Sequence, residues 1–273
     1  MTIRNVACMS YDTQTQAGRI GLMLNKVPEV TFYFWLIKVL STTVGETAAD
    51  FLDTNLNLGL TTTSLIMAAL LVVALLVQAR LDRYVAGVYW VTVVLVSIVG
   101  TLITDNLGDG YRVPLEVTTL VFAVLLALTF IAWFAVERTL SIHSIFTRRR
   151  EGFYWTTILF TFALGTAAGD LISEKLNLGY WIALALFAAA IGIVVVARFG
   201  FRVDAIASFW VAYVLTRPLG ASLGDLLSQP KDAGGLGLGT TATSFLFLAA
   251  ILALVGYLTV SKRDVSAQPA EGY

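Results

Sequence analysis

The chain has little of several residue types on which metalloenzymes and soluble proteins depend. Its 273 residues include one cysteine and one histidine, and only 13% are charged. The lone cysteine, Cys8, excludes an internal disulfide framework and a cysteine-based metal site within one chain. The lone histidine, His143, lies in a basic stretch and does not favour a zinc or haem site. The net charge is zero, which gives no basis for expecting a nucleic-acid partner.

Apolar residues take the place of the missing charges. Hydrophobic residues make up 58% of the chain and the mean hydropathy is +0.81, too apolar for a soluble domain of this length. A helix crosses a bilayer with about 20 apolar residues. We therefore predict an all-α integral membrane protein with eight transmembrane helices, at about 29–52, 60–79, 85–107, 114–136, 153–172, 179–197, 204–227 and 240–260.

Four of these runs carry one pattern: Trp, then Gly ten residues later, then Asp five residues after that. The copies align without insertion or deletion and are Trp35-Gly45-Asp50, Trp90-Gly100-Asp105, Trp155-Gly165-Asp170 and Trp210-Gly220-Asp225. Because a plainer run follows each patterned one, we predict four parallel two-helix repeats in two pseudo-symmetric halves. The expected segments are a cytoplasmic N-terminal segment (1–28), the first half with repeats 1 and 2 (29–138), a basic cytoplasmic loop (139–152), the second half with repeats 3 and 4 (153–260) and a polar C-terminal tail (261–273).

The positions of lysine and arginine predict the orientation. Thirteen lie on the side that holds both termini, and only Arg112, Lys175 and Lys231 lie on the other. Since basic residues are retained in the cytoplasm, we predict cytoplasmic termini. The first 28 residues contain no apolar core of a signal peptide.

The four aspartates of the pattern are candidate functional residues. Asp50, Asp105, Asp170 and Asp225 are expected at one depth in the outer third of the membrane, where an ionisable group indicates function. The alternative is that each one caps or hydrogen-bonds a helix end at the outer interface. An acid at a helix C-terminus opposes the helix dipole, so a cation, a proton or a basic partner is expected to compensate it.

Glu46 breaks the repeat. It follows the first motif glycine, where the other copies have Thr101, Thr166 and Ala221, and the i, i+4 spacing places it on the same helix face as Asp50. Lys38 and Arg217 are the internal counter-charges predicted for it. Two interpretations stay open: a salt-bridge network that fixes the first span against the seventh, or an ion or proton site. In the second, Glu46 and Asp50 are tentative metal ligands, because carboxylates and hydroxyls suit Mg²⁺, Mn²⁺, Ca²⁺, Na⁺ or protons.

The tryptophans and glycines of the pattern receive structural interpretations. We expect the tryptophans to anchor the helices at the cytoplasmic membrane interface. We expect the glycines to let the patterned helices approach one another closely.

The repeated helix end, seen as Gly45-Glu46-Thr47-Ala48-Ala49-Asp50 and Gly165-Thr166-Ala167-Ala168-Gly169-Asp170, resembles a known family. It is similar to bacterial membrane proteins built from the DUF347 repeat of unknown function, over about 28–260. The resemblance implies a multi-spanning protein of the bacterial inner membrane with internal repeats. It implies no catalytic or binding residues.

The leading hypothesis is an inner-membrane secondary transporter or exporter for a cation, with a divalent metal such as Mn²⁺ as candidate. The alternatives are a scaffold or sensor that transports nothing, whose buried charges form a structural network, and a transporter of organic cations. No enzyme is expected, because the chain lacks a nucleophile motif and a phosphate-binding glycine loop. No cofactor is expected. The expected partners are membrane lipids and a small cation, and homo-oligomerisation is left open.

Overall fold

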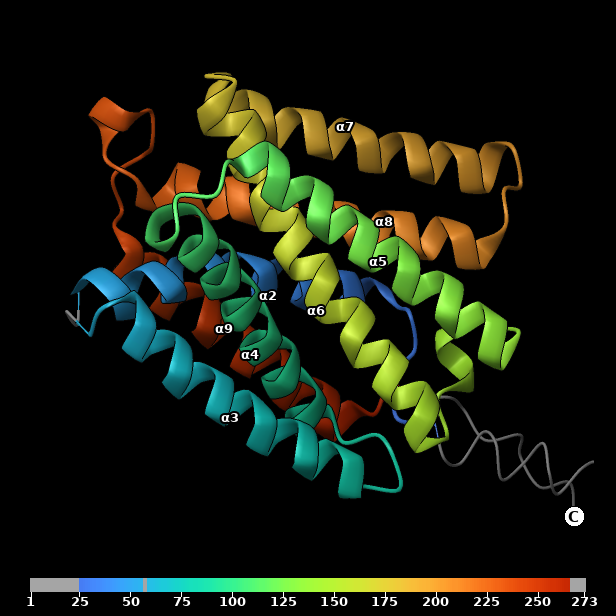
Figure 1. Cartoon of the computed structure of the whole chain (residues 1–273). Helices are drawn as coiled ribbons and strands as arrows, with labels where there is room; N and C mark the ends of the chain where they lie inside the picture. The colour runs from blue at the N-terminus through green and yellow to red at the C-terminus, as the bar shows by residue number, and fades with distance from the viewer. Residues whose placement is uncertain (1–24, 56–57, 266–273) are drawn as a thin grey trace, which may run out of the picture.

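A computed structural model describes residues 25–55 and 58–265, and these residues form a bundle of α-helices without strands (Figure 1). Cys8 and most of the N-terminal and C-terminal segments considered above lie outside the described residues. The eight α-helices found in the described ranges are α2 (Phe32–Asp50), α3 (Leu60–Arg80), α4 (Ala86–Asp105), α5 (Leu115–Glu137), α6 (Arg148–Asp170), α7 (Gly179–Gly200), α8 (Ala205–Ser228) and α9 (Thr240–Ser261).

The helix bounds agree closely with the predicted spans except at one end. Helix α6 begins at Arg148, five residues before the predicted span and inside the predicted basic loop. The reason is local: the Thr147 side chain caps the helix by accepting a hydrogen bond from the Arg150 backbone N–H at 3.3 Å. Hydropathy does not detect this first turn because it is made of charged residues.

The four helices that carry the repeated pattern close a ring. Helix α2 packs on α4, α4 on α6, α6 on α8, and α8 again on α2. The plainer helices lie outside this ring (Figure 1). Helices α3, α5 and α7 each pack on the patterned helix that follows in the chain, α4, α6 and α8, and the last helix, α9, packs on the first, α2. We refer to α2, α4, α6 and α8 as the inner helices.

Within the described residues, six helices are long and apolar enough to cross a membrane: α3, α4, α5, α6, α7 and α9. Only 17% or less of the most apolar window is buried in α3, α5, α7 and α9, against 67% in α4 and 56% in α6. Helices α2 and α8 do not reach the same hydropathy because they carry Lys38, Glu46, Arg217 and Asp225. Since both belong to the ring, their polar side chains face other helices.

The motif glycines form the contacts that close the ring. A Cβ atom at Gly45 would lie 2.5 Å from the Cβ of Ser97, which precedes the next motif glycine by three residues. The same contact recurs at the other three seams, at 2.6 Å for Gly100 and Phe162, 2.5 Å for Gly165 and Arg217, and 2.6 Å for Gly220 and Thr42. Only glycine fits at such distances, so the predicted packing role of the glycines is confirmed. The recurrence also shows that the inner helices run in the same direction.

Segments distant in the sequence meet at the end of the bundle where the inner helices begin. Lys26 forms a buried ion pair with Glu151 at 2.8 Å and donates to the carbonyl of Ala79 at 3.2 Å. The Tyr84 hydroxyl donates to Asp264 at 2.6 Å. Burial, and then this hydrogen bond, raise the pKa of Tyr84 above its ordinary value, so Tyr84 remains a neutral donor. These contacts tie both termini of the described chain to one end of the ring.

Candidate functional site

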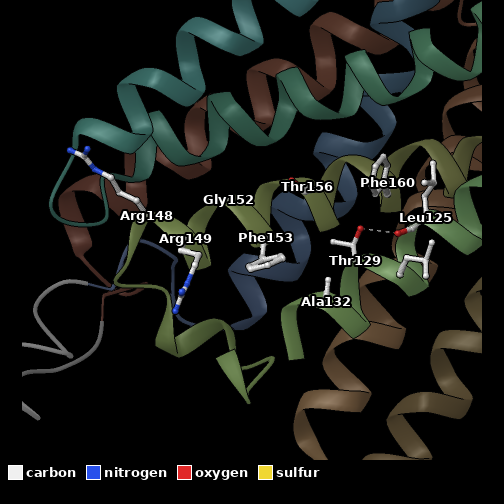
Figure 2. A pocket seen from close by; sticks show the side chains of 10 residues that line it. Leu125, Thr129, Ala132, Arg148, Arg149, Gly152, Phe153, Thr156 and Phe160 are labelled. Carbon is white, nitrogen blue, oxygen red and sulfur yellow. Dashed lines mark hydrogen bonds between the residues drawn. The ribbon is translucent and has the colours of Figure 1, made fainter. Parts of the chain in front are cut away.

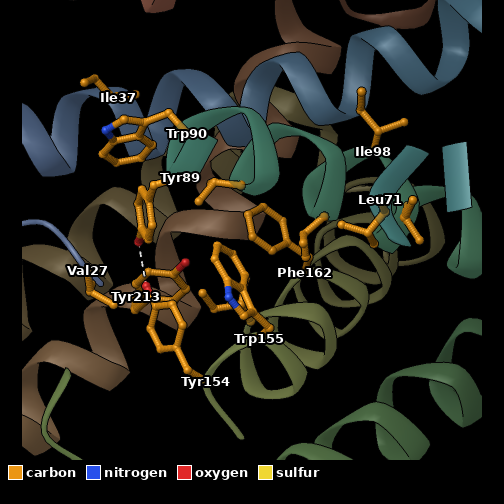
Figure 3. Packing of buried hydrophobic residues seen from close by; sticks show 14 of the residues in the cluster. Val27, Ile37, Leu71, Tyr89, Trp90, Ile98, Tyr154, Trp155, Phe162 and Tyr213 are labelled. Carbon is orange, nitrogen blue, oxygen red and sulfur yellow. Dashed lines mark hydrogen bonds between the residues drawn. The ribbon is translucent and has the colours of Figure 1, made fainter. Parts of the chain in front are cut away.

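The aromatic residues of the pattern form a layer at this end of the ring. Each residue that precedes a motif tryptophan packs against the tryptophan of the next inner helix, with ring centroids 5.6 Å apart for Phe34 and Trp90 and 5.5 Å apart for Phe209 and Trp35. Trp90, Trp155 and Trp210 are buried. The prediction that the motif tryptophans are membrane-interface anchors is therefore wrong for these three: the adjacent aromatic residues draw them into the bundle, as Figure 3 shows for Trp90 and Trp155.

Lys38 lies in the next layer and is fully buried. Its Nζ atom is 3.9 Å from the centroid of the Phe162 ring and 4.2 Å from that of the Tyr213 ring. Within the described residues this nitrogen has no hydrogen-bonding partner. The predicted counter-charge is thus held by aromatic faces. It does not form an ion pair with Glu46, which is eight residues, or about 12 Å of helix, further on.

Arg217 lies further along the ring, and its side chain has no exposed surface. Its Nη2 atom donates to Glu46 Oε2 at 2.7 Å, to Thr166 Oγ1 at 2.6 Å and to Thr101 Oγ1. Its Nη1 atom donates to the Thr42 carbonyl at 3.3 Å. The guanidinium therefore joins all four inner helices.

The hydrogen-bonding side chains around Arg217 occupy equivalent positions of the repeat. Glu46, Thr101 and Thr166 each follow a motif glycine directly, and the fourth equivalent, Ala221, belongs to the same helix as Arg217. Three equivalent side chains thus converge on one nitrogen atom. The threonines were identified in the sequence only as the residues that replace Glu46, although this equivalence is the signal that could have revealed them as ligands of Arg217.

Carboxyl groups gather next to Arg217, and its partner Glu46 is one of them. Oxygen atoms of Glu46, Asp170 and Asp225 lie within 4.8 Å of one another. Asp105 is within electrostatic range of Glu46, Asp50 and Asp170. Glu46 and Asp225 are each 6% exposed, whereas Asp170 is half-buried. The structure thus groups Glu46 with aspartates from α6 and α8, and Asp50 is not among these three residues.

The backbone changes form at three of the four motif aspartates. A π-helical turn follows directly after Asp50, Asp105 and Asp170, over Phe51–Asn55, Asn106–Gly110 and Leu171–Lys175. Helix α8 instead continues to Ser228, and residues 236–239 donate backbone hydrogen bonds to the carbonyls of 226–229. Turns of the π type are frequent at functional sites. The wider turns were not predicted, because no residue preference in these segments announces them.

Together these residues give the ring more acidic than basic side chains. From the motif tryptophans to the motif aspartates, the inner helices contain five carboxyl groups and two basic side chains, Lys38 and Arg217. Charged groups in a low-dielectric interior require compensation. Protons or a bound cation would supply it, and the oxygen atoms of Glu46, Asp170 and Asp225 are the ligands that hard cations prefer.

A family model described as "Repeat of Unknown Function (DUF347)" matches the chain four times, at residues 33–84, 88–139, 153–203 and 208–264. The chain belongs to the DUF347 repeat family. Each matched segment runs over one inner helix and the outer helix that follows it. No curated protein and no solved structure matches the chain. The DUF347 repeat assigns no chemistry, so the function has to be inferred from the geometry of the ring.

Proposed function

We propose that this protein is a secondary transporter for a hard cation, with a divalent ion such as Mn²⁺ as the leading candidate. In this proposal all eight helices cross the membrane as four parallel two-helix repeats around an axis along the membrane normal. The observation that carries the proposal is the cluster of Glu46, Asp170 and Asp225 inside the ring of inner helices. Three carboxylates from three helices meet there and repel one another when all are charged, and a bound cation or protons would relieve this repulsion.

Glu46 links this cluster to the positively charged side chain of Arg217. One of its oxygens accepts a hydrogen bond from Arg217, and a carboxylate oxygen of Glu46 also belongs to the cluster. A cation that enters the cluster competes with Arg217 for the charge of Glu46. Arg217 then acts as the counter-charge when the site is empty, and Asp50 and Asp105 act as further acids of the pathway. Such competition gives the protein two states with different affinity for the cation, as transport requires.

The orientation follows from the basic residues. The arginines at 80, 83, 138, 148–150, 198 and 202 lie at or beyond the same ends of the helices as Lys262 and Arg263, and this bias supports a cytoplasmic location for that end. We infer a multi-spanning protein of a bacterial inner membrane with cytoplasmic termini and the carboxylate cluster toward the outer face. It would need no cofactor and catalyse no covalent chemistry.

Flux measurements test the proposal. Purified protein in liposomes is assayed for transport of Mn²⁺, Mg²⁺, Ca²⁺ and Na⁺ with internal ion and pH indicators. We expect flux of at least one ion that is lost in the double variant Asp170→Asn/Asp225→Asn. The matched control is Asp232→Asn, which neutralises an exposed acid in the loop after α8. Equal flux in wild type and the double variant would refute the proposal.

Two other functions have support from particular contacts. The buried Glu46–Arg217 pair, which contacts all four inner helices, is what a scaffold or sensor without transport would need. In that case the variants lower thermal stability and no cation changes it. The aromatic faces around Lys38 Nζ favour transport of an organic cation. Competition between an alkylammonium ion and Mn²⁺ in the liposome assay separates this alternative from metal transport.

A further inference from the structure

A groove lies between α5 and α6 on the outside of the bundle, away from the carboxylate cluster. It has a volume of about 510 Å³. Apolar side chains line it from both helices, and it reaches the first turn of α6 at Arg148 and Arg149 (Figure 2). Along α6 it extends from Arg148 to Phe160, which corresponds to about 18 Å of helix.

The walls of the groove suit a hydrocarbon chain. Leu125, Leu128 and Ala132 come from α5, and the hydroxyl of Thr129 donates to the carbonyl of Leu125 at 2.8 Å (Figure 2). This bond removes the Thr129 donor from the groove. At Gly152 a Cβ atom would meet nothing within 4 Å. The groove is therefore open at Gly152, and a larger side chain there would enter it without displacing protein atoms.

The end of the groove carries excess positive charge. Glu137 pairs with Arg149 at 2.5 Å and with Arg150 at 2.6 Å, so one carboxylate is shared by two arginines. Arg148 is exposed and makes no ion pair within the described residues. Glu151, the other acid of this turn, is paired with Lys26. An anion at Arg148 is thus favoured, and it would also relieve the repulsion between the arginines and the N-terminus of α6.

We propose that this groove binds one anionic phospholipid, with an acyl chain between α5 and α6 and its phosphate group at Arg148. The apolar walls select a lipid over a soluble anion, and the arginines select an anionic headgroup over a zwitterionic one. The proposal is independent of transport through the ring.

Native mass spectrometry of the purified chain tests this site, with titrations of phosphatidylglycerol and phosphatidylcholine that have identical acyl chains. We expect wild type to bind phosphatidylglycerol more tightly than phosphatidylcholine, by about fivefold for each arginine that contacts the headgroup. The Arg148→Gln variant should lose this preference. Gly152→Leu should weaken binding of both lipids, because its side chain occupies the groove. Ala132→Leu fills the same groove from α5 and replaces Gly152→Leu if that variant does not fold.

Matched controls exist in the preceding repeat. Arg83→Gln removes an exposed arginine at the same end of the bundle, and Gly87→Leu replaces the glycine equivalent to Gly152, which also has open space around it. Both should leave the preference and the binding unchanged. The proposal is overturned if wild type shows no preference, if Arg83→Gln acts like Arg148→Gln, or if free glycerol phosphate displaces the lipid.

Discussion

Two seams of the ring have the same backbone packing and different chemistry. At the α4–α6 seam, the residues seven positions before the motif glycines are Val93 and Ile158, and those directly after the glycines are Thr101 and Thr166. At the α2–α8 seam, the equivalent positions hold Lys38 with Tyr213 and Glu46 with Ala221. Both seams close through a glycine that no other residue can replace without movement. At these two positions the α2–α8 seam carries charged side chains and the α4–α6 seam does not.

The comparison shows that the ring does not need its charges to close. Four inner helices meet by one contact pattern, and three of the four residues that meet a motif glycine are uncharged. A buried ion pair is in general no more stabilising than well-packed apolar residues. Glu46, Lys38 and Arg217 are therefore better explained by what they do than by the stability they contribute.

The largest change in stability is expected from removing only one member of the Glu46–Arg217 ion pair. Glu46→Thr installs the residue found at the equivalent positions of α4 and α6, and it leaves Arg217 buried with two threonines but no carboxylate partner at 2.7 Å. Removing one member of a buried pair costs about 3–5 kcal/mol. We expect a corresponding fall of the unfolding free energy in detergent, measured by denaturant titration.

The double variant Glu46→Thr/Arg217→Ser installs the uncharged residues that α4 carries at the equivalent positions, Thr101 and Ser97, and leaves Lys38 in place. It should recover most of the lost stability, and flux should be lost, because the cluster no longer contains Glu46. If the double variant is no more stable than Glu46→Thr alone, the charges are structural and the comparison of the two seams has been misread.

The next effect is the stabilisation of the carboxylate cluster by a cation. A ligand at one hundred times its dissociation constant adds about 2.7 kcal/mol to the unfolding free energy. Mn²⁺ should raise the melting temperature of wild type and not that of Asp170→Asn/Asp225→Asn. Without Mn²⁺ the double variant should be at least as stable as wild type, because repulsion between carboxylates has been removed. Asp232→Asn should respond to Mn²⁺ like wild type, and a response retained in the double variant would place the ion elsewhere.

The sequence predicted the glycine seams and the identity of the charged residues, because each repeats or interrupts a pattern of fixed spacing. It could not predict which acids meet. Glu46 and Asp50 share a helix face, but the ring brings Asp170 and Asp225 to Glu46 from α6 and α8. Such contacts depend on the order and tilt of the helices, which spacing along one helix does not contain. Lys38 shows the same limit, because its aromatic neighbours come from other helices.

A smaller effect is expected at the glycine seams. Gly220→Ala would place a Cβ atom 2.6 Å from the Cβ of Thr42 and 3.1 Å from the backbone nitrogen of Thr43, so helices must separate. Overpacking of this kind costs about 1–3 kcal/mol. Gly256→Ala, in open space on α9, is the control and should be neutral or slightly stabilising. Gly45→Ala with Ser97→Gly should recover stability at the neighbouring seam, and failure to do so would show that the seam is less tightly packed than this contact indicates.

The smallest change in stability is expected in the aromatic layer, where the two seams also differ. The hydroxyls of Tyr89 and Tyr154 are 2.5 Å apart across the α4–α6 seam, whereas the equivalent residues of α2 and α8, Phe34 and Phe209, meet only through their rings, with centroids 5.9 Å apart. Tyr89→Phe should cost about 1 kcal/mol, because it leaves the buried Tyr154 hydroxyl without this partner. Replacing both tyrosines by phenylalanine makes this layer uniform around the ring. The double variant should be closer to wild type than either single variant in thermal unfolding. If the two single losses simply add, the hydroxyl pair does not act as one unit, and the aromatic layer does not distinguish the two seams.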